Sequence, residues 1–265
     1  MPGVTLDLEL PHSLYSSFAH AQPSELRAIL SNLITNSVEA MGVSGRVCVT
    51  VAHKNGGTII RVDDNGKGIP KEVLPKLMEM GATFGKPNGM GVGLYHAQRK
   101  IEEWGGQIHI DSEEGVGTRV SITIPHVTPP AWFVPLINLS TASIVVVVDD
   151  DPSVHQVWKI RLGKFIESKN IEEMVHISSP ANLRKWVKEN PTKADSALFL
   201  VDYEFHGHNE TGLDLIGVLP KPDRATLVTG HSDIQTIQER CAKSKISLLP
   251  KTMLPFVPIV GDKAV

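Results

Sequence analysis

Cysteine is scarce, which limits how this chain can be stabilised. The 265 residues include two cysteines, Cys48 and Cys241, and these form no Cys-x-x-Cys pair. Cys48 also lies in an apolar run that is typical of a strand. Because disulfides follow the redox compartment of a protein, we interpret both residues as reduced thiols of a cytoplasmic protein and expect no disulfide framework.

Long apolar runs are missing as well. The purest one, Ile144–Val148, is far shorter than the roughly 20 residues of a membrane-spanning helix. The N-terminal residues do not have the pattern of a signal peptide. We therefore expect no membrane segment in this chain, which leaves open a longer parent protein that is tethered to a membrane.

Neither sign of charge dominates. The formal net charge is -3, and acidic and basic residues are spread along the chain. This pattern argues against a basic tail for nucleic acids or a basic face for anionic lipids, so no nucleic-acid partner is expected. The length suits two domains of ordinary size, and hydrophobic residues, at 41%, are enough for a core in each.

Residues 1–126 predict an α+β sandwich. Two segments have the apolar spacing of helices, and four alternate like strands, including a pair that forms a hairpin. The expected helices are Pro23–Met41 and Gly93–Trp104, and the expected strands are Arg46–Ala52, Thr58–Val62, Gln107–Ile110 and Thr118–Ile124. We expect the helices on one face of a mostly antiparallel sheet.

The pattern changes in the second half of the chain. Residues 127–143 contain three prolines and no periodicity, and we interpret them as a linker, with Trp132 and Phe133 expected to dock onto a domain. Residues 144–265 then alternate between strands and helices, which predicts an α/β doubly wound domain with a five-stranded parallel sheet. The expected strands are Ile144–Asp149, Met174–Ser178, Ala197–Asp202, Ala225–Thr229 and Ile246–Pro250.

Two asparagines lie on one face of the first expected helix. Asn32 and Asn36 are four residues apart, opposite the apolar stripe. Asparagine is unfavourable inside a helix, and its amide oxygen is a ligand that suits Mg²⁺. Taken alone, the pair is also compatible with an ordinary solvated polar face.

Two glycine segments follow these asparagines. After Asp64, Gly66 and Gly68 would let the backbone approach a flat ligand, and the carboxylate could accept a hydrogen bond from an adenine amino group. The alternative is a simple Asp-Asn-Gly turn. Gly91 and Gly93 open the second expected helix, where unpaired N–H groups favour phosphate. No Gly-Lys-Ser/Thr follows, so this segment is not a P-loop.

Together, these three segments resemble the ATP-binding domain of sensor histidine kinases, in the superfamily shared with gyrase and the mismatch-repair ATPases. The resemblance covers residues 1–126 and implies ATP and Mg²⁺ as cofactors. By it, Asn36 would hold Mg²⁺, Asn32 would help near the phosphates, and Asp64 would read adenine in a pocket shaped by Gly66 and Gly68.

The resemblance also implies a lid beside the phosphates. Gly91 and Gly93 would anchor this lid, and Lys86 could reach a phosphate from it. The lid region, residues 71–88, lacks the phenylalanine-rich stretch that is usual in the family. One alternative is therefore a non-catalytic signalling scaffold whose binding depends on nucleotide.

The position of Asn32 bears on the choice between kinase and hydrolase. In gyrase-like ATPases, a glutamate one helical turn before the metal-binding asparagine activates water. Asn32 has no carboxylate to take a proton, which favours phosphoryl transfer, although a gyrase-type ATPase remains the second alternative.

In the family, a two-helix dimerising hairpin precedes this domain and carries the phosphorylated histidine. None of the eleven histidines here lies in a helical His-Glu/Asp context with a following basic residue and proline. We therefore expect the acceptor histidine on a hairpin that is absent from this chain, and no autophosphorylation by this chain alone.

A second constellation lies at the ends of the later strands. Asp149 and Asp150 follow the first of them, Asp202 ends the third, Thr229 ends the fourth, and Lys251 follows the fifth. Parallel strands place these ends at one edge, and clustered carboxylates repel unless a cation neutralises them. The pattern predicts a phosphoryl-acceptor site in which the three aspartates hold Mg²⁺, Asp202 is the nucleophile, and Thr229 and Lys251 bind phosphoryl oxygens.

Residues 144–265 accordingly resemble the receiver domain of response regulators, which implies a hybrid sensor histidine kinase in a phosphorelay. The implied partners are the hairpin and a downstream histidine phosphotransfer protein. Two features depart from the family. The loop after Asp202 carries His206 and His208, which rarely suffice alone for a metal site. Pro255 and Pro258 should shorten or remove the final helix.

Overall fold

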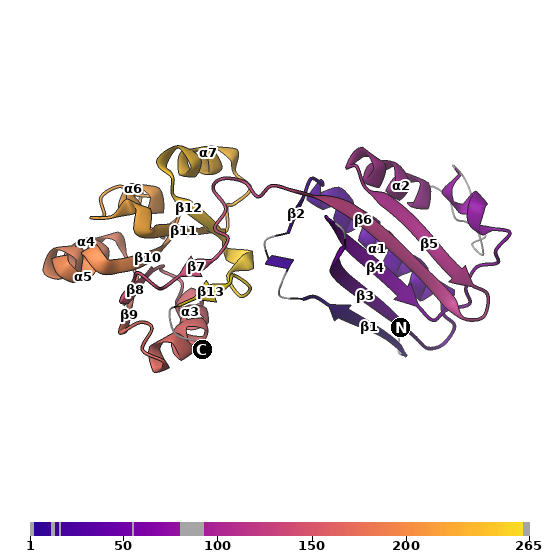
Figure 1. Ribbon diagram of the computed structural model, residues 1–265, viewed down its shortest axis with the longest axis horizontal. Helices are drawn as coiled ribbons and strands as arrows, with labels where there is room; N and C mark the ends of the chain where they lie inside the picture. Colours follow the sequence, from indigo (N-terminus) through magenta and orange to yellow (C-terminus); the bar gives the residue numbers. More distant parts are fainter. Residues whose placement is uncertain (1–2, 12–13, 16, 55, 80–92, 262–265) are drawn as a thin grey trace. The chain divides into compact units, whose positions relative to one another are not determined.

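The computed structural model describes residues 3–11, 14–15, 17–54, 56–79 and 93–261. The chain divides into two compact units, residues 1–129 and 130–265. Each unit has its own sheet and its own core (Figure 1). Among the helices that the structure describes, none has both the length and the apolarity that crossing a bilayer demands.

The first unit is built on a six-stranded mixed sheet. Its strands are β1 (Val4–Glu9), β2 (Phe18–Ala19), β3 (Gly45–Lys54), β4 (Gly57–Asp64), β5 (Gln107–Glu113) and β6 (Gly117–Val127). The order is β1-β3-β4-β6-β2, and β5 also pairs with β6. The pairing is parallel for β1 with β3 and antiparallel elsewhere, so the expected mostly antiparallel sheet is confirmed.

Two helices, α1 (Pro23–Ala40) and α2 (Gly93–Glu103), pack on one face of this sheet. Pro23 is at the start of α1, where its fixed φ suits the first helical turn. The helices bury Leu33 and Ile101 against Ile122 of β6. A short 3₁₀ helix, η2 (Leu74–Met78), follows β4. The polar residues of α1 are therefore not part of the apolar core.

The second unit contains the expected five-stranded parallel sheet. Its strands are β8 (Ile144–Val148), β9 (Glu173–Ile177), β10 (Ala197–Asp202), β11 (Ala225–Thr229) and β12 (Ser247–Pro250). The order is β12-β11-β10-β8-β9, with every pairing parallel. From β8, the chain adds β9 on one side of the sheet and β10, β11 and β12 on the other, so the strand order reverses between β8 and β10. Open α/β sheets bind ligands at such a switch point.

Helices connect these strands and cover the sheet. They are α3 (Pro152–Glu167), α4 (Pro180–Glu189), α5 (Pro191–Ser196), α6 (Gly212–Ile216), α7 (Gln235–Ser244) and the 3₁₀ helix η3 (Pro222–Arg224). All five residues of β8 are buried, which explains why this strand is a continuous apolar run and not an alternating one. The residues that directly follow such buried strands lie at the edge of the sheet.

The segment expected to be a linker is not a free connection. From Pro130 onward it belongs to the second unit, where it forms β7 (Ile137–Asn138) and buries Phe133 and Leu139. The N–H of Leu248 donates to the carbonyl of Trp132 at 2.7 Å, so the segment also pairs with β12. The apolar side chains between the prolines explain this docking, because burying them stabilises the folded segment even though its sequence has no helix or strand periodicity.

The end of the chain contains no final helix within the described residues. After β12, the 3₁₀ helix η4 (Lys251–Met253) is followed by β13 (Ile259–Val260), which pairs with β7. Arg161 of α3 donates hydrogen bonds to the carbonyls of Leu254 and Val257. Pro255 and Pro258 explain the extended course of this segment, since proline lacks the N–H that a helix needs.

Candidate functional site

The carboxylate of Asp64 is fixed at the end of β4. Its Oδ1 accepts hydrogen bonds from the N–H groups of Gly66 at 2.9 Å and Thr118 at 3.3 Å. Its Oδ2 accepts none from the residues that the structure describes. This oxygen of a half-buried side chain can therefore accept a bond from a ligand, as the adenine role requires.

The loop after Asp64 is tightly held, and two of its positions admit only glycine. A Cβ at Gly66 would lie 2.9 Å from the carbonyl oxygen of Ala40. Gly68 has a φ of +67°, and a Cβ there would lie 2.0 Å from the carbonyl oxygen of Glu113. The backbone N–H of Lys67, between them, donates to the carbonyl of Ala40 at 3.0 Å, so the loop is fastened to the end of α1.

Asn32 meets the start of α2. A Cβ at Gly93 would lie 2.4 Å from Asn32 Nδ2, so any larger residue here would displace the amide of Asn32. Asn32 Nδ2 is buried and has no hydrogen-bond partner among the described residues. Asn36 lies half-buried one turn later on α1. A buried amide with an unused N–H suits a phosphate oxygen, and the oxygen of Asn36 suits Mg²⁺.

The structure thus brings Asn32 and Gly93 together and places Asp64 with Gly66 in one loop. Two residues expected at this site, Lys86 and Gly91, lie outside the described residues. Their roles in the lid stay predictions.

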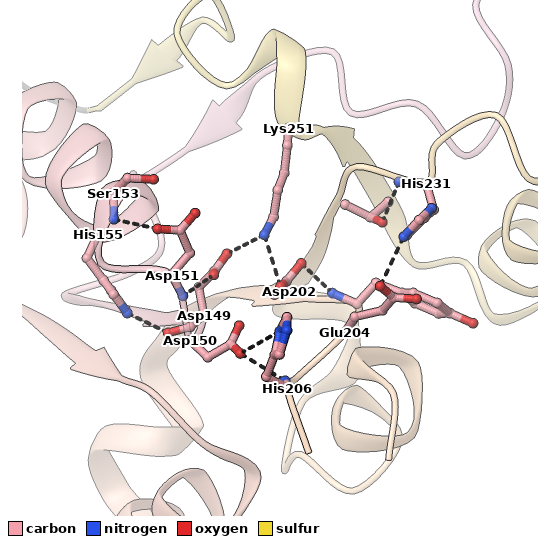
Figure 2. Close-up of polar contacts among 12 residues, drawn as sticks. Asp149, Asp150, Asp151, Ser153, His155, Asp202, Glu204, His206, His231 and Lys251 are labelled. Atoms are coloured by element: carbon pink, nitrogen blue, oxygen red, sulfur yellow. Dashed lines mark hydrogen bonds and ion pairs between the residues drawn. The ribbon is translucent and has the colours of Figure 1, made fainter. Parts of the chain in front are cut away.

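The second site is at the edge of the parallel sheet, where Asp149 and Asp150 follow β8 and Asp202 ends β10. Carboxylate oxygens of these three residues all lie within 4.8 Å of one another. Figure 2 shows them converging beside the amine of Lys251. Asp149 and Asp202 are buried, with Asp149 only 1% exposed. Such a group of oxygen ligands suits a divalent cation.

Lys251 bridges the two buried carboxylates. Its Nζ lies 2.9 Å from Asp149 Oδ2 and 2.9 Å from Asp202 Oδ2. The remaining oxygens accept backbone N–H groups, because Asp149 Oδ1 is bonded by Asp151 at 2.9 Å and Asp202 Oδ1 by Tyr203 at 2.8 Å. Asp149 Oδ2 has the ion pair with Lys251 but no well-aligned hydrogen bond from the described residues.

The carboxylates at this edge of the sheet carry more negative charge than the ammonium of Lys251 can neutralise. Burial, followed by the charge of Asp149, raises the pKa of Asp202 to about 6, although Lys251 lowers it. Burial lowers the pKa of Lys251, but the hydrogen bonds and charges of Asp149 and Asp202 outweigh it and hold that pKa above its usual value. One ammonium faces three carboxylates, so a bound cation would relieve the repulsion, and the residues present fit Mg²⁺.

Thr229 lies at the same edge. It is 1% exposed at the end of β11, which pairs with β10 on one side and β12 on the other. Its Oγ1 accepts a hydrogen bond from the N–H of His231 at 2.9 Å. The five residues expected for the acceptor site are therefore all at one edge of the sheet.

Sequence reasoning missed two histidines, His155 and His231, that contact residues at this edge. His155 Nε2 lies 2.6 Å from the carbonyl oxygen of Asp149, and His231 Nε2 lies 3.0 Å from Glu204 Oε2. The contact of His231 joins two loops that are 27 residues apart, so no local spacing indicated it, whereas His155 contacts a residue only six positions earlier.

Residues 21–128 match the family of histidine kinase-, DNA gyrase B-, and HSP90-like ATPases. The match includes both asparagines of α1, Asp64 and the glycine segments. The first unit therefore has the gyrase- and histidine-kinase-type ATP-binding fold, and the expected α+β arrangement is confirmed. The family match ends at residue 128, so the second unit is interpreted from its own geometry.

Curated proteins similar to this domain include sensor kinases. Sensor histidine kinase DcuS of Escherichia coli (strain K12) is 33% identical over 125 residues, which are 46% of this chain and 23% of DcuS. Sporulation kinase D of Bacillus subtilis (strain 168) is 35% identical over 100 residues, which are 38% of this chain and 20% of that kinase. The chain thus spans less than a quarter of each relative. The similarity supports the expected enzyme class, histidine kinase, for this domain.

A solved structure is also similar. The catalytic domain of histidine kinase ThkA is 25% identical to this chain, with a TM-score of 0.39, over 46% of this chain and 78% of that one.

Proposed function

We propose that this chain is part of a hybrid sensor histidine kinase and transfers phosphoryl groups in a two-component relay. The observation that carries the proposal is the placement of Lys251 at 2.9 Å from both Asp149 and Asp202, at the switch point of a parallel sheet. This receiver-like site is in the same chain as a histidine-kinase-type ATP-binding domain. The two chemistries complement each other, because one consumes ATP and the other accepts a phosphoryl group.

In the first unit, the proposed reaction begins with Mg²⁺ and ATP. Asp64 Oδ2 would accept the adenine amino group, Asn36 would hold the ion, and Asn32 Nδ2 would donate to a phosphate oxygen. The γ-phosphoryl group passes to a histidine nitrogen of a dimerisation hairpin, which is carried elsewhere. The bond from the γ-phosphorus to the β-phosphate oxygen breaks, an N–P bond forms, and ADP leaves.

In the second unit, a carboxylate oxygen of Asp202 attacks the phosphorus of a phosphohistidine. The N–P bond breaks, an acyl phosphate forms, and the freed imidazole takes up a proton. Lys251 and Thr229 would bind the phosphoryl oxygens, and Mg²⁺, when bound, would neutralise charge between the carboxylates and the phosphoryl group. Positioning and charge neutralisation supply the catalysis, as is usual for phosphoryl transfer. A downstream histidine phosphotransfer protein would receive the group.

Acetyl phosphate tests the acceptor site without any kinase. In Mg²⁺, mass spectrometry of the full chain should show one added phosphoryl group at Asp202, with acetate as the leaving group. EDTA or Asp202→Asn should abolish the addition. Asp195→Asn is the matched control, because Asp195 is an exposed carboxylate of the same unit that pairs with Lys221. Labelling of Asp202→Asn at the wild-type level would refute the proposal.

A second experiment separates the kinase from the scaffold and ATPase alternatives. When a histidine-bearing hairpin from a sensor kinase is supplied, the chain should transfer acid-labile phosphate to it from labelled ATP. Free phosphate should form slowly, because Asn32 cannot activate water. Rapid ATP turnover without transfer would favour the ATPase, and ATP binding with neither activity would favour the scaffold.

A further inference from the structure

Lys251 reaches the acceptor site from a short segment at the end of the last strand of the sheet. It begins the three-residue 3₁₀ helix η4, directly after Pro250, which ends β12. Its amine lies 2.9 Å from a carboxylate oxygen of Asp149 and 2.9 Å from one of Asp202 (Figure 2). Because the lysine stem is flexible, the position of this amine depends on how firmly the backbone around it is held.

The backbone before Lys251 is held by the sheet. Pro250 lies opposite Thr229 of β11. On the other edge of β12, Leu248 exchanges backbone hydrogen bonds with residues 132–134, at 2.7 and 3.2 Å. The strand is therefore paired on both sides just before the lysine, and this pairing fixes the place where η4 begins.

The backbone after Lys251 is held by Arg161 of α3. Its guanidinium donates from one nitrogen to the carbonyl of Leu254 and from another to the carbonyl of Val257. The N–H of Leu254 donates in turn to the carbonyl of Lys251 at 3.2 Å, which closes the turn of η4. Leu254 and Val257 are both buried, so the segment that Arg161 holds is part of the packed interior.

The helix that carries Arg161 begins beside the carboxylates. Its N-cap is Asp151, directly after Asp150, and the side chain of Asp151 accepts the N–H of Ser153 at 2.8 Å. Helices position side chains more precisely than loops do. Helix α3 thus links the two sides of the site, because its start adjoins the acidic loop and Arg161, further along, holds the segment of Lys251.

We propose that Arg161 is a positioning residue for phosphoryl acceptance at Asp202, because it fastens η4 to α3 and so keeps the amine of Lys251 in place for the phosphoryl oxygens. The inference rests on the proposed acceptor function, since Lys251 has this task only if Asp202 accepts phosphate. Arg161 acts through Lys251 and not on the phosphoryl group itself. A displacement of about 1 Å can cost about a hundredfold in rate, so a modest shift of η4 is enough to matter.

The rate at which the full chain acquires phosphate from acetyl phosphate, followed by mass spectrometry where all variants are folded, tests the proposal. Arg161→Ala should lower the maximal rate about tenfold or more, because the amine of Lys251 is no longer held. The Mg²⁺ concentration that gives half the maximal rate should stay within about twofold of wild type, because the oxygen ligands of the ion are unchanged.

Arg224→Ala is the matched control. Arg224 also donates to two carbonyls of this unit, those of Thr141 at 3.0 Å and Ser196 at 3.2 Å. These carbonyls precede β8 and β10, so they lie at the opposite edge of the parallel sheet from Asp202. The control removes the same kind of bonds, and it should keep the wild-type rate.

The reactivity of the Lys251 amine gives a second readout that needs no phosphoryl transfer. In the metal-free chain, a short pulse of acetic anhydride should modify Lys251 more slowly than Lys185, whose side chain is 71% exposed. The reason is that the amine of Lys251 is paired with two carboxylates. Arg161→Ala should speed the acetylation of Lys251 and leave that of Lys185 unchanged, whereas Arg224→Ala should change neither.

Equal maximal rates for wild type and Arg161→Ala would overturn the proposal, as would equal losses in Arg161→Ala and Arg224→Ala. If Arg161→Ala does not fold, Arg161→Lys takes its place, because a single ammonium lacks the fixed fork of donors of a guanidinium. A wild-type rate in Arg161→Lys would then overturn the proposal in the same way.

The outcomes also separate this inference from the acceptor function. If wild type acquires no phosphate at Asp202 while Arg161→Ala still speeds the acetylation of Lys251, the anchoring of the amine by Arg161 stands and the acceptor function fails. If wild type is labelled and Arg161→Ala matches it in both readouts, the acceptor function stands and Arg161 positions nothing.

Discussion

Replacing Asp64 with asparagine should weaken ATP binding without disturbing the loop around it. The amide oxygen of the new side chain can still accept the N–H groups of Gly66 and Thr118, which the carboxylate now binds at 2.9 and 3.3 Å. In Asp64→Asn, an NH₂ group takes the place of the carboxylate oxygen Oδ2. A donor would then face the adenine amino group, which is also a donor.

The size of the effect follows from the bond that is lost. A hydrogen bond to a charged group contributes about 1.5–3 kcal/mol, which corresponds to a loss of roughly 10- to 100-fold in affinity. We expect this loss in calorimetric titrations of the full chain with ATP in Mg²⁺. The temperature of unfolding without nucleotide should change little, because the backbone bonds to Oδ1 remain.

The neighbouring residue provides the matched control. Asp63 is ion-paired with Arg119 on the sheet, so Asp63→Asn removes the same charge one position away. We expect its ATP affinity to stay within about twofold of wild type, since surface ion pairs contribute little. Equal ATP affinity for Asp64→Asn and wild type, or equal losses in both variants, would refute the adenine role of Asp64.

Three further predictions concern the two units separately. In metal-free protein, Asp202 should titrate near pH 6 by carboxyl ¹³C NMR, and Lys251→Met should move the midpoint upward, because Lys251 lowers this pKa. Because the folded-state pKa of Asp202 is raised from 3.8, the folded protein should lose stability as the pH rises through about 6, and Asp202→Asn should remove that loss. Gly68→Ala should lower the unfolding temperature more than Gly115→Ala, because both have positive φ but a Cβ at position 115 meets no atom within 4 Å; equal losses would contradict the contact with Glu113. Arg161→Ala should destabilise the second unit by about 1.5–3 kcal/mol in urea unfolding, as expected for lost charged hydrogen bonds, whereas the exposed Lys159→Ala should not.

The sequence predicted those features that local pattern determines. The expected helix from Pro23 and the strand from Ala197 to Asp202 are observed at nearly the same bounds. Their apolar residues repeat at the period of the element, so a short window contains the signal. The acid cluster could be predicted for a related reason, because polar residues directly after buried strands share the edge of a parallel sheet.

Contacts between distant segments could not be predicted in this way. Arg161 reaches the carbonyl of Leu254, 93 residues later, and no local pattern marks either partner. The docking of Phe133 could be expected from its apolar side chain, but the strand that receives its segment, β12, could not, because the two are far apart in sequence. The contact between His231 and Glu204 likewise depends on two loops whose course only the structure describes.

The pairing of residues 132–134 with β12 protects an otherwise open strand. The N–H of Leu248 donates to Trp132, and its carbonyl accepts from Val134 at 3.2 Å. Unpaired strand edges are templates for association with other chains. A version of the second unit beginning at Ile144 would leave this edge of β12 bare, and it should therefore self-associate where one beginning at Pro130 stays monodisperse.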